Sequence, residues 1–173
     1  MCPDFAARLR ELATAAGADA ATVEADGHAR WRLYTRALDD AALRVAVPAV
    51  LRLDPDGPLV SAVVTRALGL VRDRETWVDL PPAGPLRDQV RRRLHELRLL
   101  EGLADDVEAC GGNVATWSPW LQLRAAESAS AHQVLRALAE GGGTRQVRYR
   151  ARERLRQVRP SAEGTGPSPR IGD

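Results

Sequence analysis

The sequence predicts an all-α protein, and three observations carry this prediction. Ala and Leu, both strong helix formers, dominate the apolar residues, while aromatic residues make up only 4% of the chain. Apolar residues recur at helical spacing, and no long alternation of Val, Ile and Thr indicates a strand. Residues that cap or end helices stand at the borders of these segments. We expect about eight helices, covering residues 3–16, 27–39, 41–53, 58–72, 85–103, 119–129, 131–140 and 145–158.

The first two helices have clear apolar faces. Their inward positions carry Phe5, Leu9 and Leu12, and Trp31, Tyr34 and Leu38. These spacings place each set on one side of a helix. Gly17 is a favourable residue for ending the first helix. Residues 18–26 are expected to form a loop or one short turn.

The third expected helix, 41–53, contains Pro48 in its interior. Asp40 stands immediately before it, where an N-cap residue is expected. Proline lacks the backbone N–H that an interior helix position donates, and its ring clashes with the preceding turn. We therefore predict a kink at residues 44–47.

A turn, a fourth helix and a connector follow. Residues 54–57 read Asp-Pro-Asp-Gly, which is strong turn chemistry. The helix over 58–72 has an inward stripe of Leu59, Val63, Ala67 and Leu70. Residues 73–84 are expected to connect it to the next helix, and they include Trp77.

The longest helix is expected over 85–103, followed by a loop over 104–116. Its buried side is predicted to contain Leu86, Val90, Leu97 and Leu100. Ser118 then stands at an N-cap position, with Pro119 at the first helical position. This order is favoured because the first helical N–H has no partner in any helix, so proline loses nothing there.

Two helices joined by three glycines complete the folded region. Ser130 and Gln133 have the spacing of a capping box at the start of the first helix. The glycines at 141–143 end it, and Thr144 is expected to cap the second. The second helix has an apolar stripe of Val147, Ala151, Leu155 and Val158.

The 173 residues are enough for one sizeable hydrophobic core. We predict a helical repeat domain over 1–159 and a disordered tail over 160–173. The tail has three Pro, three Gly and a single large apolar residue, Ile171. Such a composition buries too little surface to offset the entropy lost on ordering.

Two segments resemble HEAT or armadillo-like repeats. Residues 147–155 form V-R-x-x-A-x-x-x-L after a glycine-rich turn, similar to the second helix of such a repeat. Residues 54–68 resemble the same turn and second helix, with Ser61 in place of the Arg, and the proline-containing helix before them resembles the kinked first helix. The resemblance covers 41–72 and 118–158. It implies a HEAT-like α-solenoid of antiparallel helix pairs that binds partners on a concave face.

The sharpest candidate site is an arginine stripe on the last helix. It consists of Arg145, Arg148, Arg152, Arg156 and Arg159. At roughly 100° per residue they fall within about 80° of one another, apart from the apolar stripe. Such a stripe suits the phosphates of nucleic acid or an acidic protein patch. The alternative is a solvated outer face whose arginine stems cover apolar surface. All 25 basic residues of the chain are Arg, which is typical of a GC-rich genome.

No catalytic residue, cofactor site or metal site is predicted. His28, His95 and His132 have no Cys or carboxylate at ligand spacing. Cys2 and Cys110 are too far apart in sequence to form a metal motif or a disulfide framework. The glycine triplet lacks the G-K-[ST] of a phosphate loop, and the serines lack a nucleophile elbow.

The sequence therefore predicts a non-enzymatic scaffold or adaptor that binds another protein, which the sequence does not identify. One alternative is a nucleic-acid-binding module that uses the last helix. Another is a relative of the DNA alkylation repeat glycosylases, which are also HEAT-like and use Arg, Trp and Asp on a concave face. The absence of a signal peptide and of a long apolar run predicts a cytoplasmic protein without membrane contact. The oligomeric state stays open.

Overall fold

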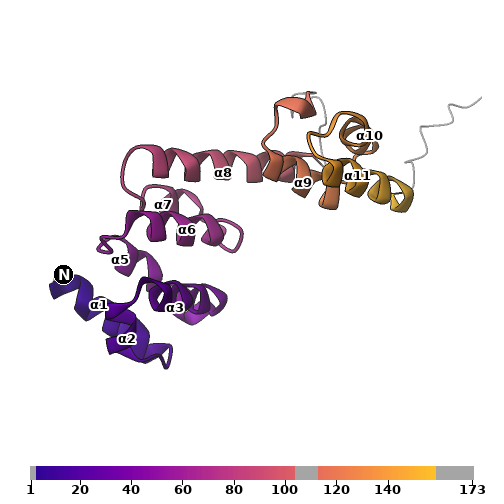
Figure 1. The fold of residues 1–173 in the computed structure, drawn as a ribbon. Coiled ribbons are helices and arrows are strands. Elements are labelled where there is room, and N and C mark those ends of the chain that lie inside the picture. The colour runs from indigo at the N-terminus through magenta and orange to yellow at the C-terminus, as the bar shows by residue number, and fades with distance from the viewer. Residues whose placement is uncertain (1–2, 104–112, 159–173) are drawn as a thin grey trace, which may run out of the picture. The chain divides into compact units, whose positions relative to one another are not determined.

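The computed structural model describes residues 3–103 and 113–158, and within them the chain is all-α, as predicted (Figure 1). Helix accounts for 75%, and the described residues contain no strand. They form eleven α-helices rather than about eight, and one short 3-10 helix. The elements are α1 (Pro3–Ala15), α2 (Ala20–Ala25), α3 (Gly27–Asp39), α4 (Ala41–Arg44), α5 (Val47–Leu51), α6 (Gly57–Ala67), α7 (Glu75–Val78), α8 (Pro85–Gly102), η1 (Val114–Thr116), α9 (Pro119–Ser128), α10 (His132–Gly141) and α11 (Arg145–Gln157).

The additional helices are short ones in segments expected to be loops or a single helix. α2 and α7 occupy parts of the segments 18–26 and 73–84. The expected helix over 41–53 is divided into α4 and α5. Pro48 is the second residue of α5, where its missing N–H costs no hydrogen bond. The helix is distorted at the predicted position, but it is divided into two helices there and not merely kinked.

Side-chain caps start most of the helices. The capping oxygens belong to Asp19, Asp26, Asp40, Asp56, Asn113, Ser118 and Thr144. Their bonds satisfy backbone N–H groups that have no partner within the helix. Hydrogen bonds from Thr22 lower the pKa of the Asp19 carboxyl, and the His28 N–H does the same for Asp26. The caps predicted at Asp40, Ser118 and Thr144 are confirmed.

The capping box predicted at Ser130 is wrong. α10 begins at His132, its N-cap residue is Ala131, and no side chain caps it. Ser130 is exposed and lies one residue too early to serve as the N-cap. Burial of the apolar face of α10 therefore holds this helix without a side-chain cap at its start.

The chain divides into two compact units, Met1–His95 and Glu96–Asp173, with the boundary inside α8. In the first unit, α3 packs against α2, α4, α5 and α6. Its buried side carries Leu33, Tyr34, Ala37 and Leu38, while Trp31 is only half-buried. The predicted inward residues of α1 are all buried. Leu70, which was predicted to face inward, is 42% exposed.

In the second unit, α11 packs against both α9 and α10. The buried core is made of Leu103, Val114, Ala125, Ala126, Ala129, Val134, Leu135, Leu138, Ala139, Val147 and Ala151. The predicted apolar stripe of α11 is therefore confirmed at Val147 and Ala151. Leu155 and Val158 pack against this core but are only partly buried. Residue 159 and the predicted tail lie outside the described residues.

The glycines between α10 and α11 differ in what surrounds them. Gly141 is the last residue of α10, and a Cβ there would meet no atom within 4 Å. At Gly142 a Cβ would lie 2.6 Å from the carbonyl oxygen of Leu138 and 2.7 Å from Cγ1 of Val147. Gly142 therefore permits the close approach of α10 and α11, whereas Gly141 does not contribute to it.

These two glycines should respond to the same substitution with opposite signs. Gly142→Ala should lower the free energy of unfolding by about 1–3 kcal/mol, because the methyl group overlaps backbone and core atoms. Gly141→Ala should raise it by up to about 1 kcal/mol, because alanine favours the helical conformation and has room there. Urea unfolding of both variants measures the difference. Equal effects would contradict the packing described for this turn.

Candidate interaction surfaces

Two arginines of the predicted stripe form hydrogen bonds within the second unit. Nη1 of Arg148 donates to the carbonyl oxygen of Gly142 at 2.6 Å, and Nη2 of Arg152 donates to that of Ala139 at 3.1 Å. Both acceptors lie at the C-terminal end of α10, where carbonyl groups lack helical partners and carry partial negative charge. The two guanidinium groups therefore cap the C-terminal end of α10 by bonding to its carbonyl groups.

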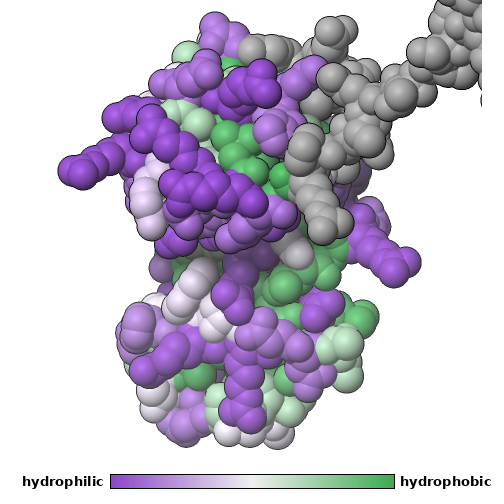
Figure 2. Space-filling model, turned by 90° about the vertical axis from the view of Figure 1, so that its right-hand side faces the viewer, coloured by the Kyte–Doolittle hydropathy of each residue, from purple (hydrophilic) through white to green (hydrophobic). Residues whose placement is uncertain are grey.

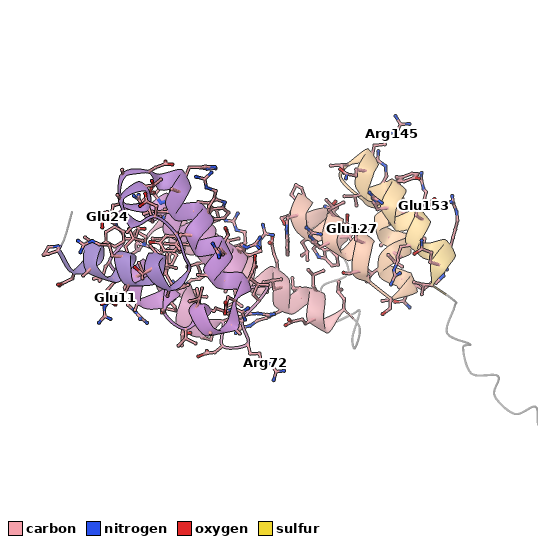
Figure 3. The ribbon with its side chains drawn as sticks, turned by 90° about the horizontal axis from the view of Figure 1, so that it is seen from below. Glu11, Glu24, Arg72, Glu127, Arg145 and Glu153 are labelled. Carbon is pink, nitrogen blue, oxygen red and sulfur yellow. The ribbon has the colours of Figure 1, made fainter. Side chains whose placement is uncertain are left out.

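The other members of the stripe differ in their surroundings. Arg156 forms an exposed ion pair with Glu153, one turn earlier on α11. Arg145 is exposed and extends away from the helix (Figure 3), with no hydrogen bond or ion pair to any described residue. Arg159 lies outside the described residues. Arg150, which was not part of the predicted stripe, is also exposed and has no hydrogen bond or ion pair to a described residue.

The contact made by Arg148 recurs at other helix connections. In each case a guanidinium nitrogen donates to the carbonyl oxygen of the residue six positions earlier, across the turn between two helices. The pairs are Arg30 with Glu24 (3.5 Å), Arg44 with Leu38 (2.6 Å), Arg74 with Leu68 (2.7 Å), Arg87 with Pro81 (3.0 Å) and Arg148 with Gly142 (2.6 Å). Charge-assisted bonds of this kind are stronger than those between neutral groups. Arginine therefore has a structural role in both units, which the composition alone did not indicate.

Loss of the Arg148 contact should destabilise the second unit. We expect Arg148→Gln to lower the free energy of unfolding by about 1.5–3 kcal/mol, the range for a hydrogen bond from a charged group. Arg150→Gln is the matched control on the same helix, and it should change that energy by less than about 0.5 kcal/mol. Chemical unfolding of the two variants distinguishes them. If both were neutral, Arg148 would be an ordinary surface residue.

Gln122 is a buried polar residue that joins three parts of the second unit. Its Nε2 donates to the carbonyl oxygens of Val114 and Trp117, both at 3.0 Å. Its Oε1 accepts from the backbone N–H of Gly143 at 2.7 Å. The side chain is therefore a structural link between η1, the start of α9 and the glycine turn, and nothing in the local sequence distinguishes it from a surface glutamine.

A second buried polar cluster lies in the first unit. The hydroxyl of Tyr34 donates to Oδ2 of Asp54 at 2.7 Å, and Oδ1 of the same carboxylate accepts from the N–H of Asp56 at 2.9 Å. Nε of Arg30 lies 3.6 Å from Asp54 Oδ2. Burial, reinforced by the negative charge of Asp54, raises the pKa of Tyr34 well above its ordinary value. The tyrosine is therefore a fixed hydrogen-bond donor at any physiological pH, which suits a structural role.

The most exposed large apolar residue among the described residues, Val45, lies between α4 and α5. We call residues 41–49 the α4–α5 ridge; Arg44 is its only charged residue. Its exposed side chains are Ala41, Ala42, Val45, Ala46 and Ala49. Val45 is 82% exposed. Exposed apolar surface is not confined to the ridge, since Leu53 and Leu70 are also exposed, and Figure 2 shows hydrophobic patches among hydrophilic ones on one face of the molecule. Contiguous exposed apolar surface is typical of interaction sites.

A groove runs along each side of the ridge. One has a volume of about 370 Å³ and lies against α1, where Arg8 and Glu11 form an ion pair of 3.2 Å. The other, which we call the Val45 groove, has a volume of about 470 Å³. It is lined by Ala41, Arg44, Val45, Pro48, Leu70, Val71, Arg72 and Trp77. The sequence pattern did not indicate this surface, because Leu70 continues the apolar stripe of α6 but lies beyond the helix end, in the turn that follows it.

Other kinds of site are not found in the described residues. No three His, Cys, Asp or Glu side chains within 3–103 and 113–158 are grouped as metal ligands would be. None of the helices described for those ranges combines the length and the apolar character that a membrane span needs. Protein-family models, curated proteins and solved structures provide no match to this chain.

Proposed function

We propose that this protein is a non-enzymatic helical adaptor that binds a partner protein through the α4–α5 ridge. The exposed apolar side of the ridge carries the proposal. Val45 and Leu70 both line the Val45 groove, and they are 82% and 42% exposed to water. Covering that surface with a partner would release its hydration water and favour association.

The repeat hypothesis is part of this proposal. α10 and α11 pack closely on either side of a three-residue connection, as the two helices of a HEAT-like repeat would. The break at Pro48 stands where such repeats have a kinked first helix. A degenerate α-solenoid would leave helix faces open for partners, and the ridge is one such face.

Site-specific photocrosslinking in the native host tests the adaptor function. A photoreactive residue at position 45 should give an adduct of defined mass, and the same residue at position 92, an exposed site on α8, should not. Leu70→Glu should abolish the adduct while leaving the melting temperature unchanged, because the new charge would be buried at the interface. An adduct that is insensitive to Leu70→Glu, or no adduct at position 45, would contradict the proposal.

A nucleic-acid interface is the second candidate, and Tyr149 favours it. This tyrosine is 59% exposed on α11, close in sequence to Arg145 and Arg150, whose guanidinium groups are free of the contacts that occupy Arg148 and Arg152. An aromatic ring beside cations suits base stacking with phosphate contact. The salt dependence of binding to a short oligonucleotide tests it, since replacing both free arginines by Gln should reduce the slope by about 1.4–1.8.

A further inference from the structure

We infer that the occupant of the Val45 groove is an acidic, apolar segment of the partner protein, in which a carboxylate follows a large aliphatic side chain. This inference rests on the proposed adaptor function and adds the chemistry of the segment that binds. It is drawn from the shape, lining and charge of the groove.

The apolar part of the lining suits an aliphatic side chain. Pro48 and Val71 are half-buried, and Trp77 is 6% exposed, so the groove has apolar walls and an aromatic residue in its lining. Val45 and Leu70 remain exposed beside them. A Leu or Ile side chain inserted there would contact apolar atoms from α4, α5 and the turn after α6.

The charged part of the lining suits a carboxylate. Arg44 and Arg72 are the only charged residues that line the groove, so its lining has a formal charge of +2 and no acidic side chain. Arg44 is held in place by bonds from Nε to the Leu38 carbonyl at 2.6 Å and from Nη1 to the Leu70 carbonyl at 3.4 Å. These acceptors are neutral, so the positive charge of Arg44 is not cancelled by a carboxylate.

Arg72 is the residue on which the prediction of charge depends. It is exposed, extends away from the ribbon (Figure 3), and has no hydrogen bond or ion pair to a residue that the structure describes. The groove along the other side of the ridge differs, because its only charged residues, Arg8 and Glu11, pair with each other. A preference for acidic segments is therefore expected at the Val45 groove and not at its neighbour.

Matched synthetic peptides test this inference on the full chain. Each peptide has a Leu-containing core followed by Glu, Gln or Arg, and binding is followed by NMR of the Val45 and Leu70 methyl groups. The Glu peptide should bind about fivefold more tightly than the Arg peptide, which is the effect of one exposed ion pair. Arg72→Glu should remove this preference, because Arg44 and the new carboxylate then give the lining no net charge. Arg92→Glu, which makes the same charge change on α8, should change each affinity less than twofold.

Each other outcome overturns the inference in a distinguishable way. Equal binding of the three peptides, or no binding of any, would reject an acidic segment as the occupant of the groove. The adaptor function would then be tested by the crosslinking experiment alone. Methyl shifts that depend on protein concentration without peptide would identify a second copy as the occupant. Shifts caused by a short oligonucleotide at the same methyl groups would identify a polyanion. Failure of the crosslinking experiment alone would reject the adaptor function itself.

Discussion

Asp54→Ala should lower the free energy of unfolding of the first unit by about 3–5 kcal/mol, the range for removing one partner of a buried ion pair. The Asp54 side chain is fully buried, and that of Arg30 is 13% exposed. Nε of Arg30 is buried and makes no hydrogen bond, so the buried positive charge of Arg30 is stabilised by the nearby carboxylates of Asp54 and Asp56. Removal of Asp54 also leaves the Tyr34 hydroxyl without its acceptor.

Two further variants separate the contributions within this cluster. Tyr34→Phe removes only the hydroxyl and should cost about 1–2 kcal/mol. Combining it with Asp54→Ala should give less than the sum of the two, because they share one hydrogen bond. Asp73→Ala, at an exposed position, is the control and should be nearly neutral. Urea unfolding measures all four proteins, and strict additivity would show that the tyrosine and the aspartate do not interact.

Gln122→Leu should destabilise the second unit by about 3 kcal/mol or more. Leucine fills a similar volume, but the Trp117 carbonyl and the Gly143 N–H would lose the bonds that Gln122 makes to them, and the Val114 carbonyl would keep only the bond from the Trp117 N–H at 3.3 Å. Each buried polar group left unsatisfied costs about 1–3 kcal/mol. Gln133→Leu, at an exposed position on α10, should change stability by less than about 0.5 kcal/mol.

Hydrogen exchange gives a local test of the same link. The Gly143 amide proton should exchange markedly faster in Gln122→Leu, because it loses its 2.7 Å bond. The Val147 amide proton, which is bonded to the Thr144 hydroxyl, should keep its protection relative to the rest of the unit. Unchanged exchange at Gly143 would mean that the turn is held by its backbone alone, and the role assigned to Gln122 would be wrong.

Features whose causes lie within a few residues follow directly from the sequence. Ser118 and Thr144 cap the helices that follow them, since a cap bonds to an N–H three residues away. The helix predicted over 41–53 is divided near Pro48, because proline lacks the backbone N–H and its ring clashes with the preceding turn. The apolar residues of α1 are buried because their helical spacing gives them one face. The all-α class follows from such local signals added along the chain.

Features whose partners lie far along the chain depend instead on how the helices pack. Tyr34 and Asp54 are 20 residues apart, and Gln122 and Gly143 are 21 apart. No local pattern pairs such residues, because the pairing is set by how helices pack. The same reason applies to the arginines of α11. Helical spacing placed them on one face, but the position of α10 decides that Arg148 bonds to a helix end while Arg145 has no hydrogen bond or ion pair to a described residue.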